Sequence, residues 1–398
     1  MAVRKIAENI YAVGVVDWNV RAFHGNTYVT DRGTTYNAYL ILDEKITLID
    51  TVYGPFANEL ISNIKEIVDP SKIDYIIANH VETDHSGALP EVLKLCPRAK
   101  VYGTSKCKEG LEKYYQIPMD FQIVKTGDKL KIGKKTLTFV EAPMIHWPDS
   151  MFTYSIEDQI LFPNDAFGHH LASNKTYTDE VDECALWDEC SKYYANILWP
   201  LGTLIDKKIN DVIKMNIPIK MIAPSHGLIW RQNPMQIVEK YLYWAKNSTT
   251  NKVIIFYETM WNSTEKMAKK ILEGINSAGL EARLYDVTKV DRTTLINDLL
   301  EAKGFLAGSS THDNEMLPSI AGFLYFLKGL KPKNRIAAAF GSFGWAGGAT
   351  AKIENELKEA GVEIVLPSVQ VRFAPTPEEL QKCFEFGKAF AGIWGHNT

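Results

Sequence analysis

The stretch that decides the fold is His80-Val-Glu-Thr-Asp-His85, which follows the apolar run Tyr75-Ile-Ile-Ala-Asn79. Two imidazoles and two carboxylates, all potential metal ligands, lie within this short segment. His80 and Glu82 are two positions apart, so they point to the same side if the segment is extended. The last two residues of the stretch are adjacent and can reach a second position. One segment can therefore supply ligands to two metal ions.

Three further apolar runs each lead into a residue that can bind metal. Residues 137–145 precede His146, residues 159–164 precede Asp165, and residues 219–225 precede His226. If these runs are neighbouring strands, their ends meet at one edge of the sheets, where sites usually form. A single histidine or aspartate at a strand end is more often solvated or hydrogen-bonded than a ligand, but the joint pattern predicts two metals. The predicted ligands, with Asp165 as the bridge, are His80, Glu82, Asp84, His85, His146, Asp165 and His226.

The carboxylate of Glu82 affects which metal ion the site prefers. The cluster resembles the metallo-β-lactamase-fold signature His-x-His-x-Asp-His, with Glu82 in place of the second histidine. A carboxylate there makes the site harder and more anionic, which suits iron better than zinc. Three carboxylates also neutralise part of the charge of a ferric pair. The substitution favours iron, and by itself it leaves zinc open.

The composition is that of an ordinary globular protein, with 398 residues of which 46% are hydrophobic and 23% charged. The formal net charge of −4 offers no basic field for a nucleic-acid backbone or a membrane surface. The N-terminus lacks the apolar core of a signal peptide, and no apolar stretch has the roughly 18 residues that a membrane span needs. The five cysteines include no Cys-x-x-Cys pair and give no metal or disulfide framework. We therefore expect a soluble, cytoplasmic protein without nucleic-acid or membrane partners.

A polar segment at residues 246–252 separates two regions of different pattern. After it, apolar strands alternate with amphipathic helices, starting with strand 253–257 and helix 264–277, which fits a doubly wound parallel sheet. Before it, two groups of strands with helices outside indicate a sandwich of two sheets. We predict an α/β protein with an αββα sandwich at residues 1–248 and a doubly wound sheet at residues 252–398. Further predicted elements include the strands 10–15, 36–42 and 363–366 and the helix 295–302.

Three strand-end loops in the second region have the features of a flavin site. They are Glu258-Thr-Met-Trp-Asn-Ser-Thr264, Gly308-Ser-Ser-Thr-His-Asp-Asn314 and Gly341-Ser-Phe-Gly-Trp-Ala-Gly-Gly348. Hydroxyls and backbone N–H groups at a helix N-terminus cradle phosphate, and Trp261 and Trp345 offer flat faces to a ring. Asn262 with Glu265 also fits a capping box, so a simply capped helix is the alternative for the first loop alone.

The cofactor predicted for these loops is FMN, because the G-x-G-x-x-G dinucleotide pattern is absent from the first turn. All three loops lie on the side of the sheet where ligands bind. The candidate FMN-binding residues are Thr259, Met260, Trp261, Asn262, Ser263, Thr264, Ser309, Ser310, Thr311, His312, Asp313, Asn314, Ser342, Phe343, Gly344, Trp345, Ala346 and Gly347.

The two halves together resemble the flavodiiron protein family along essentially the whole chain. The first half resembles the metallo-β-lactamase fold and the second resembles flavodoxin, in the order and spacing of that family. No rubredoxin-like or flavin-reductase stretch follows, so the chain is similar to the minimal two-domain class, the A-type flavoproteins. Family-like stretches are residues 32–39, 146–151, 193–196, 259–261 and 263–267.

The resemblance implies a role for each predicted ligand. It assigns His80, Glu82 and His146 to the iron nearer the flavin, with Asp165 bridging. It assigns to the other iron the residues Asp84, His85 and His226. His24 and Tyr193 match residues near the diiron pocket, where they hydrogen-bond a bound diatomic molecule or steer protons. Ordinary structural packing is the alternative interpretation of those two residues.

The resemblance also implies the reaction and the partners. We expect an oxidoreductase that reduces dioxygen to water, nitric oxide to nitrous oxide, or both, at a non-haem diiron site supplied with electrons through FMN. The expected donor is a separate rubredoxin-like protein or a reduced deazaflavin. The expected assembly is a head-to-tail homodimer or a homotetramer, in which each flavin lies beside the partner's iron pair. The residues do not decide between dioxygen and nitric oxide.

Two other functions stay open at this point. The first is a zinc-dependent hydrolase of metallo-β-lactamase fold with an accessory flavodoxin-like domain, which zinc in place of iron, or the absence of flavin, would support. The second is an electron carrier with a vestigial metal site, which a failure to consume either gas would support.

Overall fold

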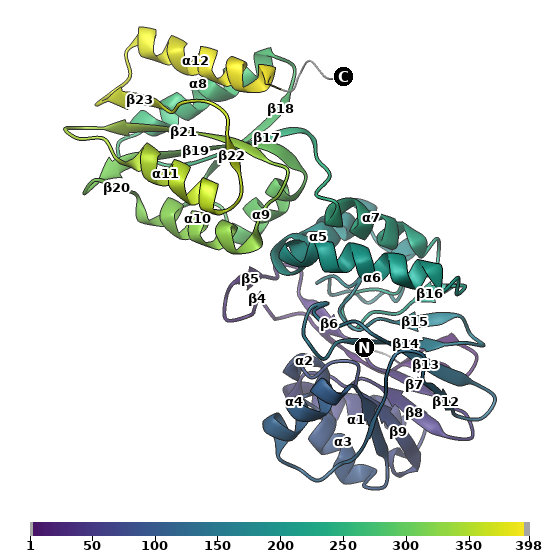
Figure 1. Ribbon diagram of the computed structural model, residues 1–398. Coiled ribbons are helices and arrows are strands. Elements are labelled where there is room, and N and C mark those ends of the chain that lie inside the picture. Colours follow the sequence, from purple (N-terminus) through teal and green to yellow (C-terminus); the bar gives the residue numbers. More distant parts are fainter. Residues whose placement is uncertain (1–2, 394–398) are drawn as a thin grey trace. The chain divides into compact units, whose positions relative to one another are not determined.

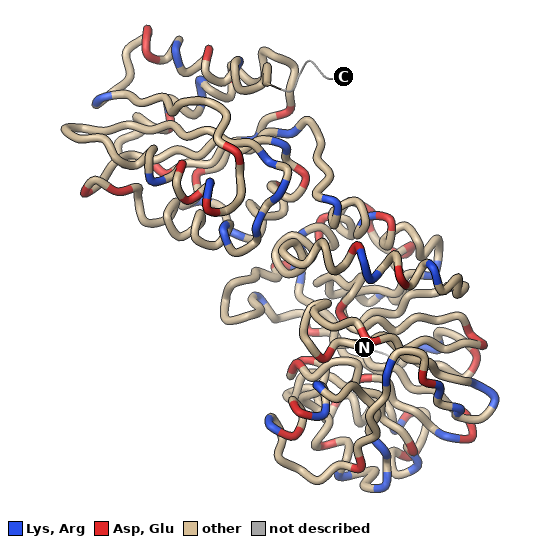
Figure 2. Tube along the Cα trace, viewed as in Figure 1, with Lys and Arg blue, Asp and Glu red and all other residues tan. Residues whose placement is uncertain are grey.

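The computed structural model describes residues 3–393, which divide into two compact units. The first unit comprises Met1–Tyr193 and Thr203–Leu242, and the second comprises Tyr194–Gly202 and Tyr243–Thr398. The ends of the two domains predicted from the sequence, residues 1–2 and 394–398, lie outside the described residues. Basic and acidic residues are interspersed along the trace of each unit (Figure 2).

Two sheets form the body of the first unit (Figure 1). The larger sheet consists, in spatial order, of β1 (Arg4–Ala7), β2 (Ile10–Ala12), β7 (Tyr39–Ile41), β8 (Ile46–Ile49), β9 (Ile73–Ile77), β10 (Lys100–Gly103) and β11 (Asp120–Ile123). The smaller sheet consists of β12 (Lys129–Lys131), β13 (Thr136–Glu141), β14 (Met151–Ser155), β15 (Ile160–Phe162) and β16 (Met221–Ile222). Two short pairs complete the strands: β3 (Val15–Asp17) with β6 (Thr34–Tyr36), and β4 (Ala22–Phe23) with β5 (Tyr28–Val29).

Helices lie outside both sheets of the first unit. On the side of the larger sheet they are η1 (Gly54–Phe56), α1 (Ala57–Lys65), η2 (Pro70–Lys72), α2 (Thr83–Ser86), α3 (Leu89–Leu95) and α4 (Ser105–Tyr115). On the side of the smaller sheet they are η3 (Thr178–Glu180), α5 (Glu183–Tyr193), α6 (Gly202–Lys214) and α7 (Met235–Ala245). Between α5 and α6 the chain forms the π-helical turn η4 (Tyr194–Leu198) and the short helix η5 (Trp199–Leu201).

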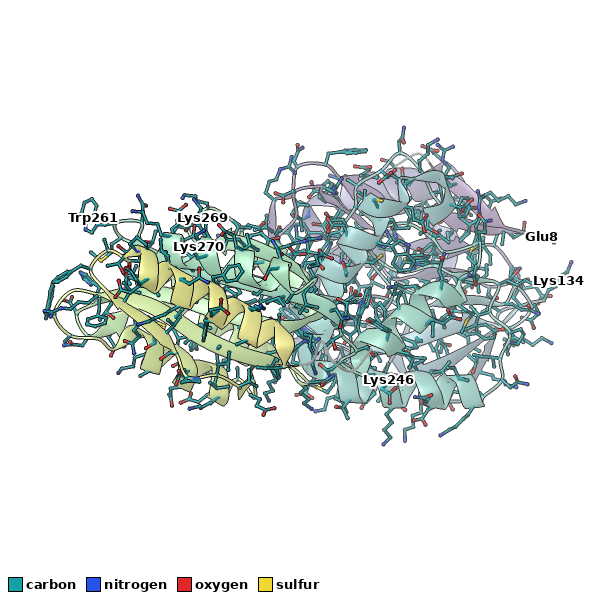
Figure 3. All side chains as sticks on the ribbon, turned by 90° about the horizontal axis from the view of Figure 1, so that it is seen from above. Glu8, Lys134, Lys246, Trp261, Lys269 and Lys270 are labelled. Atoms are coloured by element: carbon teal, nitrogen blue, oxygen red, sulfur yellow. The ribbon has the colours of Figure 1, made fainter. Side chains whose placement is uncertain are left out.

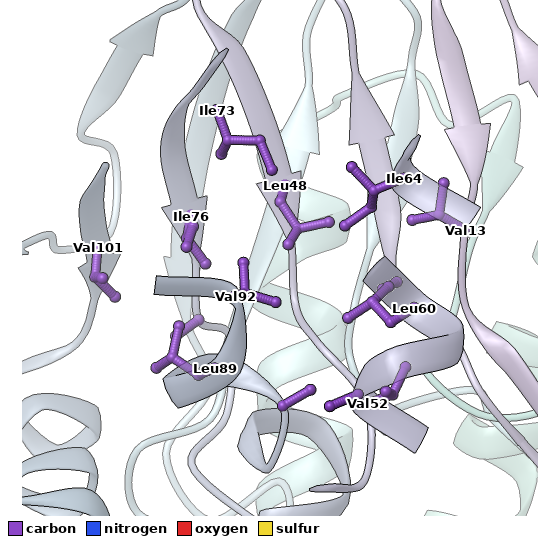
Figure 4. Close-up of a cluster of buried hydrophobic side chains, with 14 of the residues drawn as sticks. Val13, Leu48, Val52, Leu60, Ile64, Ile73, Ile76, Leu89, Val92 and Val101 are labelled. Carbon is purple, nitrogen blue, oxygen red and sulfur yellow. The ribbon is translucent and has the colours of Figure 1, made fainter. Parts of the chain in front are cut away.

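Two apolar cores hold these layers together. In one, side chains of α1 and α3 pack on the larger sheet, as Leu60, Val92 and Leu48 illustrate (Figure 4). In the other, residues such as Ile77 and Phe162 fill the space between the two sheets. The sheets therefore pack face to face with helices on both outer sides, which is an αββα sandwich.

The second unit is built on one mainly parallel sheet with the strand order β18-β17-β19-β21-β22, to which β20 and β23 add. Its strands are β17 (Thr250–Glu258), β18 (Glu281–Asp286), β19 (Ala302–His312), β20 (Glu315–Met316), β21 (Ile336–Phe343), β22 (Glu363–Ile364) and β23 (Val369–Arg372). Its helices are α8 (Ser263–Ser277), α9 (Arg292–Leu300), α10 (Pro318–Leu330), α11 (Ala349–Glu359) and α12 (Pro377–Gly392). Helices α8 and α12 cover one face of the sheet, and α10 and α11 cover the other (Figure 1).

The central strand β19 is buried along most of its length, as expected for a parallel strand covered on both faces. This arrangement is the predicted doubly wound sheet. Among residues 3–393, no helix combines the length and the apolar composition that crossing a membrane requires.

Some predicted element boundaries were wrong for identifiable reasons. The predicted strand 36–42 is divided between β6 and β7, because the backbone N–H of Asn37 donates to Ser225 O (2.8 Å) rather than to a neighbouring strand. The predicted strand 10–15 is likewise divided at Gly14, whose backbone lies directly against Tyr36. The predicted helix 295–302 begins earlier, because the Asp291 carboxylate accepts a hydrogen bond from Thr294 N (2.9 Å).

Helices α8 and α12 approach each other through two glycines. A Cβ atom on Gly274 would lie 2.0 Å from the backbone oxygen of Phe384, and one on Gly387 would lie 2.1 Å from that of Ile271. Side chains at either position would push the helices apart. Gly322 on α10, in contrast, has open space where a Cβ would lie.

We predict that Gly274→Ala destabilises the second unit by about 1–3 kcal/mol, because the added methyl group overpacks a backbone contact. Chemical unfolding followed by circular dichroism and by flavin release measures this effect. The matched control is Gly322→Ala, which should stabilise the same unit by about 1 kcal/mol through helix propensity. Equal stability of Gly274→Ala and the wild type would contradict the close packing of α8 on α12.

Candidate metal centre and flavin site

The seven predicted metal ligands meet at one end of the sandwich. His80 and Glu82 follow β9, and Asp84 and His85 lie on the short helix α2. The other three follow strands of the smaller sheet: His146 after β13, Asp165 after β15 and His226 after β16. Asn79 joins the two sheets beneath the site, since its backbone oxygen accepts from Met151 N (2.9 Å) and its side chain from Thr153 Oγ1 (2.6 Å).

One group of ligand atoms comes from His80, Glu82, His146 and Asp165, and all of these atoms lie within 4.8 Å of one another. His146 Nε2 is 3.4 Å from Glu82 Oε2 and 3.2 Å from Asp165 Oδ2. His80 Nε2 is 3.3 Å from the same Glu82 oxygen and 3.6 Å from the same Asp165 oxygen. Two imidazole nitrogens and two carboxylate oxygens thus face a common point.

A second group comes from Asp84, His85 and His226. His226 Nε2 is 3.1 Å from Asp84 Oδ2, and His85 Nε2 is 3.4 Å from Asp84 Oδ1. Both imidazoles also face Asp165, whose oxygen Oδ1 lies 2.9 Å from His85 Nε2 and 3.5 Å from His226 Nε2. The two oxygens of Asp165 therefore face different groups, which is the geometry of a bridging carboxylate.

The donor set fits a pair of metal ions. Ligands that bind one ion at about 2.1 Å lie about 3.0–3.4 Å from each other, close to the separations seen here. Within residues 3–393, both ring nitrogens of His85, Oδ1 of Asp84 and Oδ2 of Asp165 are buried and make no hydrogen bond of good geometry, although ionic groups lie as close as 2.9 Å to them. Buried polar atoms are normally satisfied, so these orphaned atoms point to a cation.

Neighbouring groups fix the orientation of two of the imidazoles. His80 Nδ1 lies 3.1 Å from both oxygens of Asp149, and His226 Nδ1 donates to Thr35 O (2.7 Å). These contacts direct Nε2 of each ring at the centre and hold the remaining proton on Nδ1 when a metal is bound. Sequence reasoning missed Asp149, although it lies in the stretch 146–151 that marked the resemblance.

In the metal-free cluster, interactions between the imidazoles and the carboxylates shift the pKa values of both kinds of group. Burial alone would lower the pKa of His80, but hydrogen bonds to Asp149 and Glu82 raise it to about 10. The pKa of His146 is raised to about 10 and that of His85 to about 9, since the carboxylates outweigh burial. The pKa values of Glu82, Asp84 and Asp165 are lowered, because the nearby imidazoles outweigh the effect of burial on these carboxyls.

The two further residues predicted at this site lie near different ligands. His24 Nε2 is 3.4 Å from Glu82 Oε1, and its side chain is about one-third exposed. Tyr193 is buried, with its ring centroid 6.4 Å from that of His226 and 5.1 Å from that of His170. Both residues therefore border the ligand cluster, and their catalytic roles stay predictions.

The second unit contains a pocket of about 410 Å³ at the carboxyl ends of β17, β19 and β21. It is large enough for a flavin mononucleotide. Trp261 and Trp345, at its rim, are each 85% exposed, and Figure 3 shows the Trp261 side chain extending outward. The predicted residues that line it are Met260, Trp261, Ser263, Ser310, Thr311, His312, Ser342, Phe343, Gly344 and Trp345.

Other predicted flavin residues support the pocket from behind. Thr264 Oγ1 lies 3.0 Å from Ser310 Oγ and 2.9 Å from Ser342 Oγ, so three hydroxyls join the three loops. Ser309 is buried; its hydroxyl donates to Ser310 O (2.8 Å) and accepts from Leu317 N (2.9 Å), directly before α10. Thr259 does not line the pocket, and its buried hydroxyl has no hydrogen-bond partner among the described residues. The remaining predicted residues, which do not line the pocket, are Asn262, Asp313, Asn314, Ala346 and Gly347.

The pocket has a fourth wall that sequence reasoning missed. Phe373 and Ala374 line it directly after β23, and Arg372 Nε donates to Gly344 O (2.8 Å). A strand at residues 369–372 was not predicted, although its alternating apolar residues were a signal. The predicted capping box of Asn262 and Glu265 was wrong: Asn262 adopts a left-handed conformation (φ 64°), and its side chain does not cap α8.

Comparisons with known proteins match both halves of the chain. The family described as "ODP family beta lactamase" matches residues 34–227, and "Flavodoxin" matches residues 255–387. A nitric oxide reductase of Moorella thermoacetica is 48% identical over 97% of each chain. An anaerobic nitric oxide reductase flavorubredoxin of Salmonella arizonae is 44% identical over 98% of this chain and 82% of its own length.

Two solved structures are also similar to this chain over nearly its whole length. Rubredoxin oxygen:oxidoreductase from Desulfovibrio gigas superposes with a TM-score of 0.95, at 36% identity over 98% of each chain. The flavodiiron protein from Giardia intestinalis gives a TM-score of 0.94, at 34% identity over 98% of this chain and 96% of that one.

The fold and the site define an oxidoreductase made of a metallo-β-lactamase-like domain followed by a flavodoxin domain. The chain belongs to the flavodiiron protein family. The predicted family and fold class are confirmed, and so are the cofactors, a non-haem diiron pair and FMN. The donor set of the first unit and the pocket of the second fit these two cofactors.

We predict that iron binding to the metal-free protein releases protons and strengthens with pH. His80, His85 and His146 are protonated at pH 7, because their pKa values lie at about 9–10, and each must lose its proton to bind metal. Affinity should rise up to about tenfold per pH unit for each proton released. Anaerobic calorimetric titrations in buffers of different ionisation enthalpy count the protons.

The raised pKa values of these three histidines also affect the stability of the metal-free protein. A histidine whose pKa is raised on folding contributes stability that is complete below the unfolded value of about 6.5 and is lost as the pH rises through about 9–10. Iron binding without proton release at pH 7 would show that the imidazoles are neutral before the metal arrives.

We predict that Trp345→Ala weakens FMN binding about tenfold and leaves the iron content unchanged, because an aromatic contact with the flavin ring is lost. Fluorescence titration of flavin-depleted protein gives the affinity, and elemental analysis gives the iron. The matched control is Trp18→Ala, which removes an exposed tryptophan from the first unit. Unchanged flavin affinity and absorption spectrum in the Trp345 variant would remove this residue from the site.

Proposed function

We propose that this protein reduces nitric oxide to nitrous oxide as its preferred reaction, and dioxygen to water as a second one. When bound, the diiron pair supplies electrons to the diatomic substrate, and FMN delivers electrons to the irons. The observation that carries the proposal is the position of Asp165, whose two oxygens face two separate groups of ligands. Two metals held this close can act together on one small molecule.

The protein's own residues hold and balance this centre. We propose as iron ligands His80, Glu82 and His146 on one side and Asp84, His85 and His226 on the other, with Asp165 between them. His24 orients Glu82 through its Nε2 contact, and buried Tyr193 presents its side chain beside His226. Burial of the ligands keeps bulk water out of the centre, which limits the loss of partly reduced products.

The preference for nitric oxide rests on similarity. The relative from Moorella thermoacetica named as a nitric oxide reductase is 48% identical, whereas the Desulfovibrio gigas protein named for oxygen is 36% identical. Dioxygen remains the second candidate because the latter structure superposes with a TM-score of 0.95. The zinc hydrolase considered from the sequence is not favoured by these relatives.

We also propose the electron donor and the assembly. A separate rubredoxin-like protein donates electrons to the flavin, in keeping with the names of the flavorubredoxin and rubredoxin oxygen:oxidoreductase relatives, and a reduced deazaflavin is the alternative donor. The apolar rim formed by exposed Trp261 and Trp345 suits cover by another protein surface. We propose a cytoplasmic head-to-tail homodimer or a homotetramer of it, with domains 1–248 and 252–398 in each chain.

We predict that the purified protein contains about two irons and one FMN per chain and consumes nitric oxide faster than dioxygen. Elemental analysis, the visible spectrum and gas electrodes with a chemical reductant measure these quantities. Asp165→Asn should lose iron and at least about 100-fold of the turnover while keeping FMN, because an amide has one oxygen donor and no charge and so cannot bridge the two metals. Asp211→Asn, at an exposed position of α6, is the matched control.

Two outcomes would contradict this function. Zinc without a flavin chromophore would restore the hydrolase hypothesis, and wild-type-like iron and turnover in Asp165→Asn would exclude the bridging role. Faster consumption of dioxygen than of nitric oxide would reverse the order of the two substrates.

A further inference from the structure

A second group of buried polar side chains lies next to the metal ligands. Its members come from residues 28–34, from the segment before Leu171, and from α5. Each is less than 5% exposed, although most of these residue types normally lie at the surface. We call it the polar cluster, and it consists of Tyr28, Thr30, Thr34, His170, Glu189, Lys192 and Tyr193.

The inner end of the polar cluster reaches the metal ligands. Thr34 Oγ1 lies 2.8 Å from His170 Nδ1 and 3.4 Å from His226 Nδ1. The His170 ring centroid is 5.1 Å from those of both Tyr28 and Tyr193. Burial holds the pKa of His170 well below its ordinary value, so this ring is neutral. Polar groups therefore surround His226 on the side away from its metal-binding nitrogen.

The outer end of the polar cluster reaches solvent at the turn of Asp31 and Arg32. Lys192 Nζ lies 5.9 Å from the ring centroid of Tyr28 and 3.6 Å from Asp31 Oδ2. Arg32 Nε lies 3.1 Å from Glu189 Oε1, and the Arg32 side chain is 47% exposed. The polar cluster thus connects a solvated turn to the surroundings of His226.

Glu189 is the acidic member of this cluster. Its side chain is 2% exposed, and its oxygen Oε2 is buried without a hydrogen-bond partner among residues 3–393. It lies four residues before Tyr193 on α5, so both side chains are on one face of the helix. The helix changes to the π-helical turn η4 directly after Tyr193, and such turns often occur at functional sites.

The protonation of Glu189 changes near neutral pH. Burial raises its pKa to about 7, although Lys192 and Arg32 act to lower it. Asp188 on its own helix and Asp31 on the facing turn act in the same direction as burial. A buried carboxyl with this pKa can both take up and release a proton under working conditions.

We propose that Glu189 carries protons from solvent to the metal centre: its carboxyl gains a proton beside Arg32 and passes one through the polar cluster to Tyr193, whose ring lies beside the predicted metal ligand His226. This inference rests on the proposed function. Two nitric oxide molecules take up two electrons and two protons to give nitrous oxide and water, and dioxygen takes up four of each. The electrons come through FMN, and each proton that leaves Glu189 is replaced from solvent.

The test compares Glu189→Gln with Glu183→Gln. The first variant keeps an acceptor for Arg32 but cannot carry a proton, and the second makes the same change at an exposed position of α5. We expect Glu189→Gln to slow gas reduction about tenfold or more, with iron, FMN and flavin reduction unchanged. Wild-type turnover should fall as the pH rises above about 7, because Glu189 then loses its proton, and this fall should be absent in the variant.

A second variant and a spectroscopic signal keep the inference testable if Glu189→Gln folds poorly. Arg32→Gln removes the cation that lowers the pKa of Glu189, so the fall in turnover should move to higher pH. Infrared spectroscopy of the wild type should show a protonated carboxyl band that disappears on titration near pH 7. The same band should be missing from Glu189→Gln.

Different results would overturn different claims. Turnover of Glu189→Gln within about twofold of Glu183→Gln, with the same pH profile and solvent isotope effect, would overturn the role of Glu189 alone. A pH profile of Arg32→Gln identical to that of the wild type would do the same. Wild-type protein that carries iron and FMN but reduces neither gas would overturn the proposed function and this inference with it.

Discussion

The shared carboxylate of Asp165 is the constraint on which the metal-binding unit depends. Four imidazoles and three carboxylates lie together at the end of the sandwich, five of them buried and Glu82 and His146 partly buried, and buried charges are tolerated only when they are compensated. Asp165 compensates both halves of the cluster, since Oδ1 faces His85 and Oδ2 faces His146. The β-sandwich must therefore deliver ligands from both sheets to within hydrogen-bond distance of one side chain.

For the ligands to meet in this way, the two sheets must be held in a fixed position relative to each other at the site. Asn79 provides one lock, because it follows β9 of the larger sheet and bonds two residues of β14 in the smaller sheet. Asp149 provides another, since it accepts from Val81 N (2.7 Å) while it holds the ring of His80. The groups that orient the ligands are thus also the groups that join the layers, so the rigidity of the fold and the geometry of the site have the same cause.

The sequence was sufficient to predict the ligands because their signal is local. Each follows an apolar run, and the carboxyl ends of neighbouring strands converge whatever the details of packing. Asp149, Thr34 and His170 gave no such signal, because their roles come from contacts between segments far apart in the chain. The difference between local and distant signals also applies at the flavin pocket. Trp345 lies in a loop that follows a predicted strand, whereas the position of Phe373 depends on the pairing of β23 with β21. Element ends were wrong where a side chain or a distant backbone group intervened, as at Asn37 and Asp291.

The glycine contact between α8 and α12 links two segments that emerge at different times during synthesis of the chain. Helix α8 begins directly after the first flavin loop, and its Thr264 hydroxyl joins that loop to the other two. The face of α8 that holds Gly274 is covered by α12, the last helix of the described chain. During synthesis, the predicted iron ligands, residues 80–226, therefore leave the ribosome before the flavin loops, and α8 obtains its support from α12 only after residue 392 has emerged.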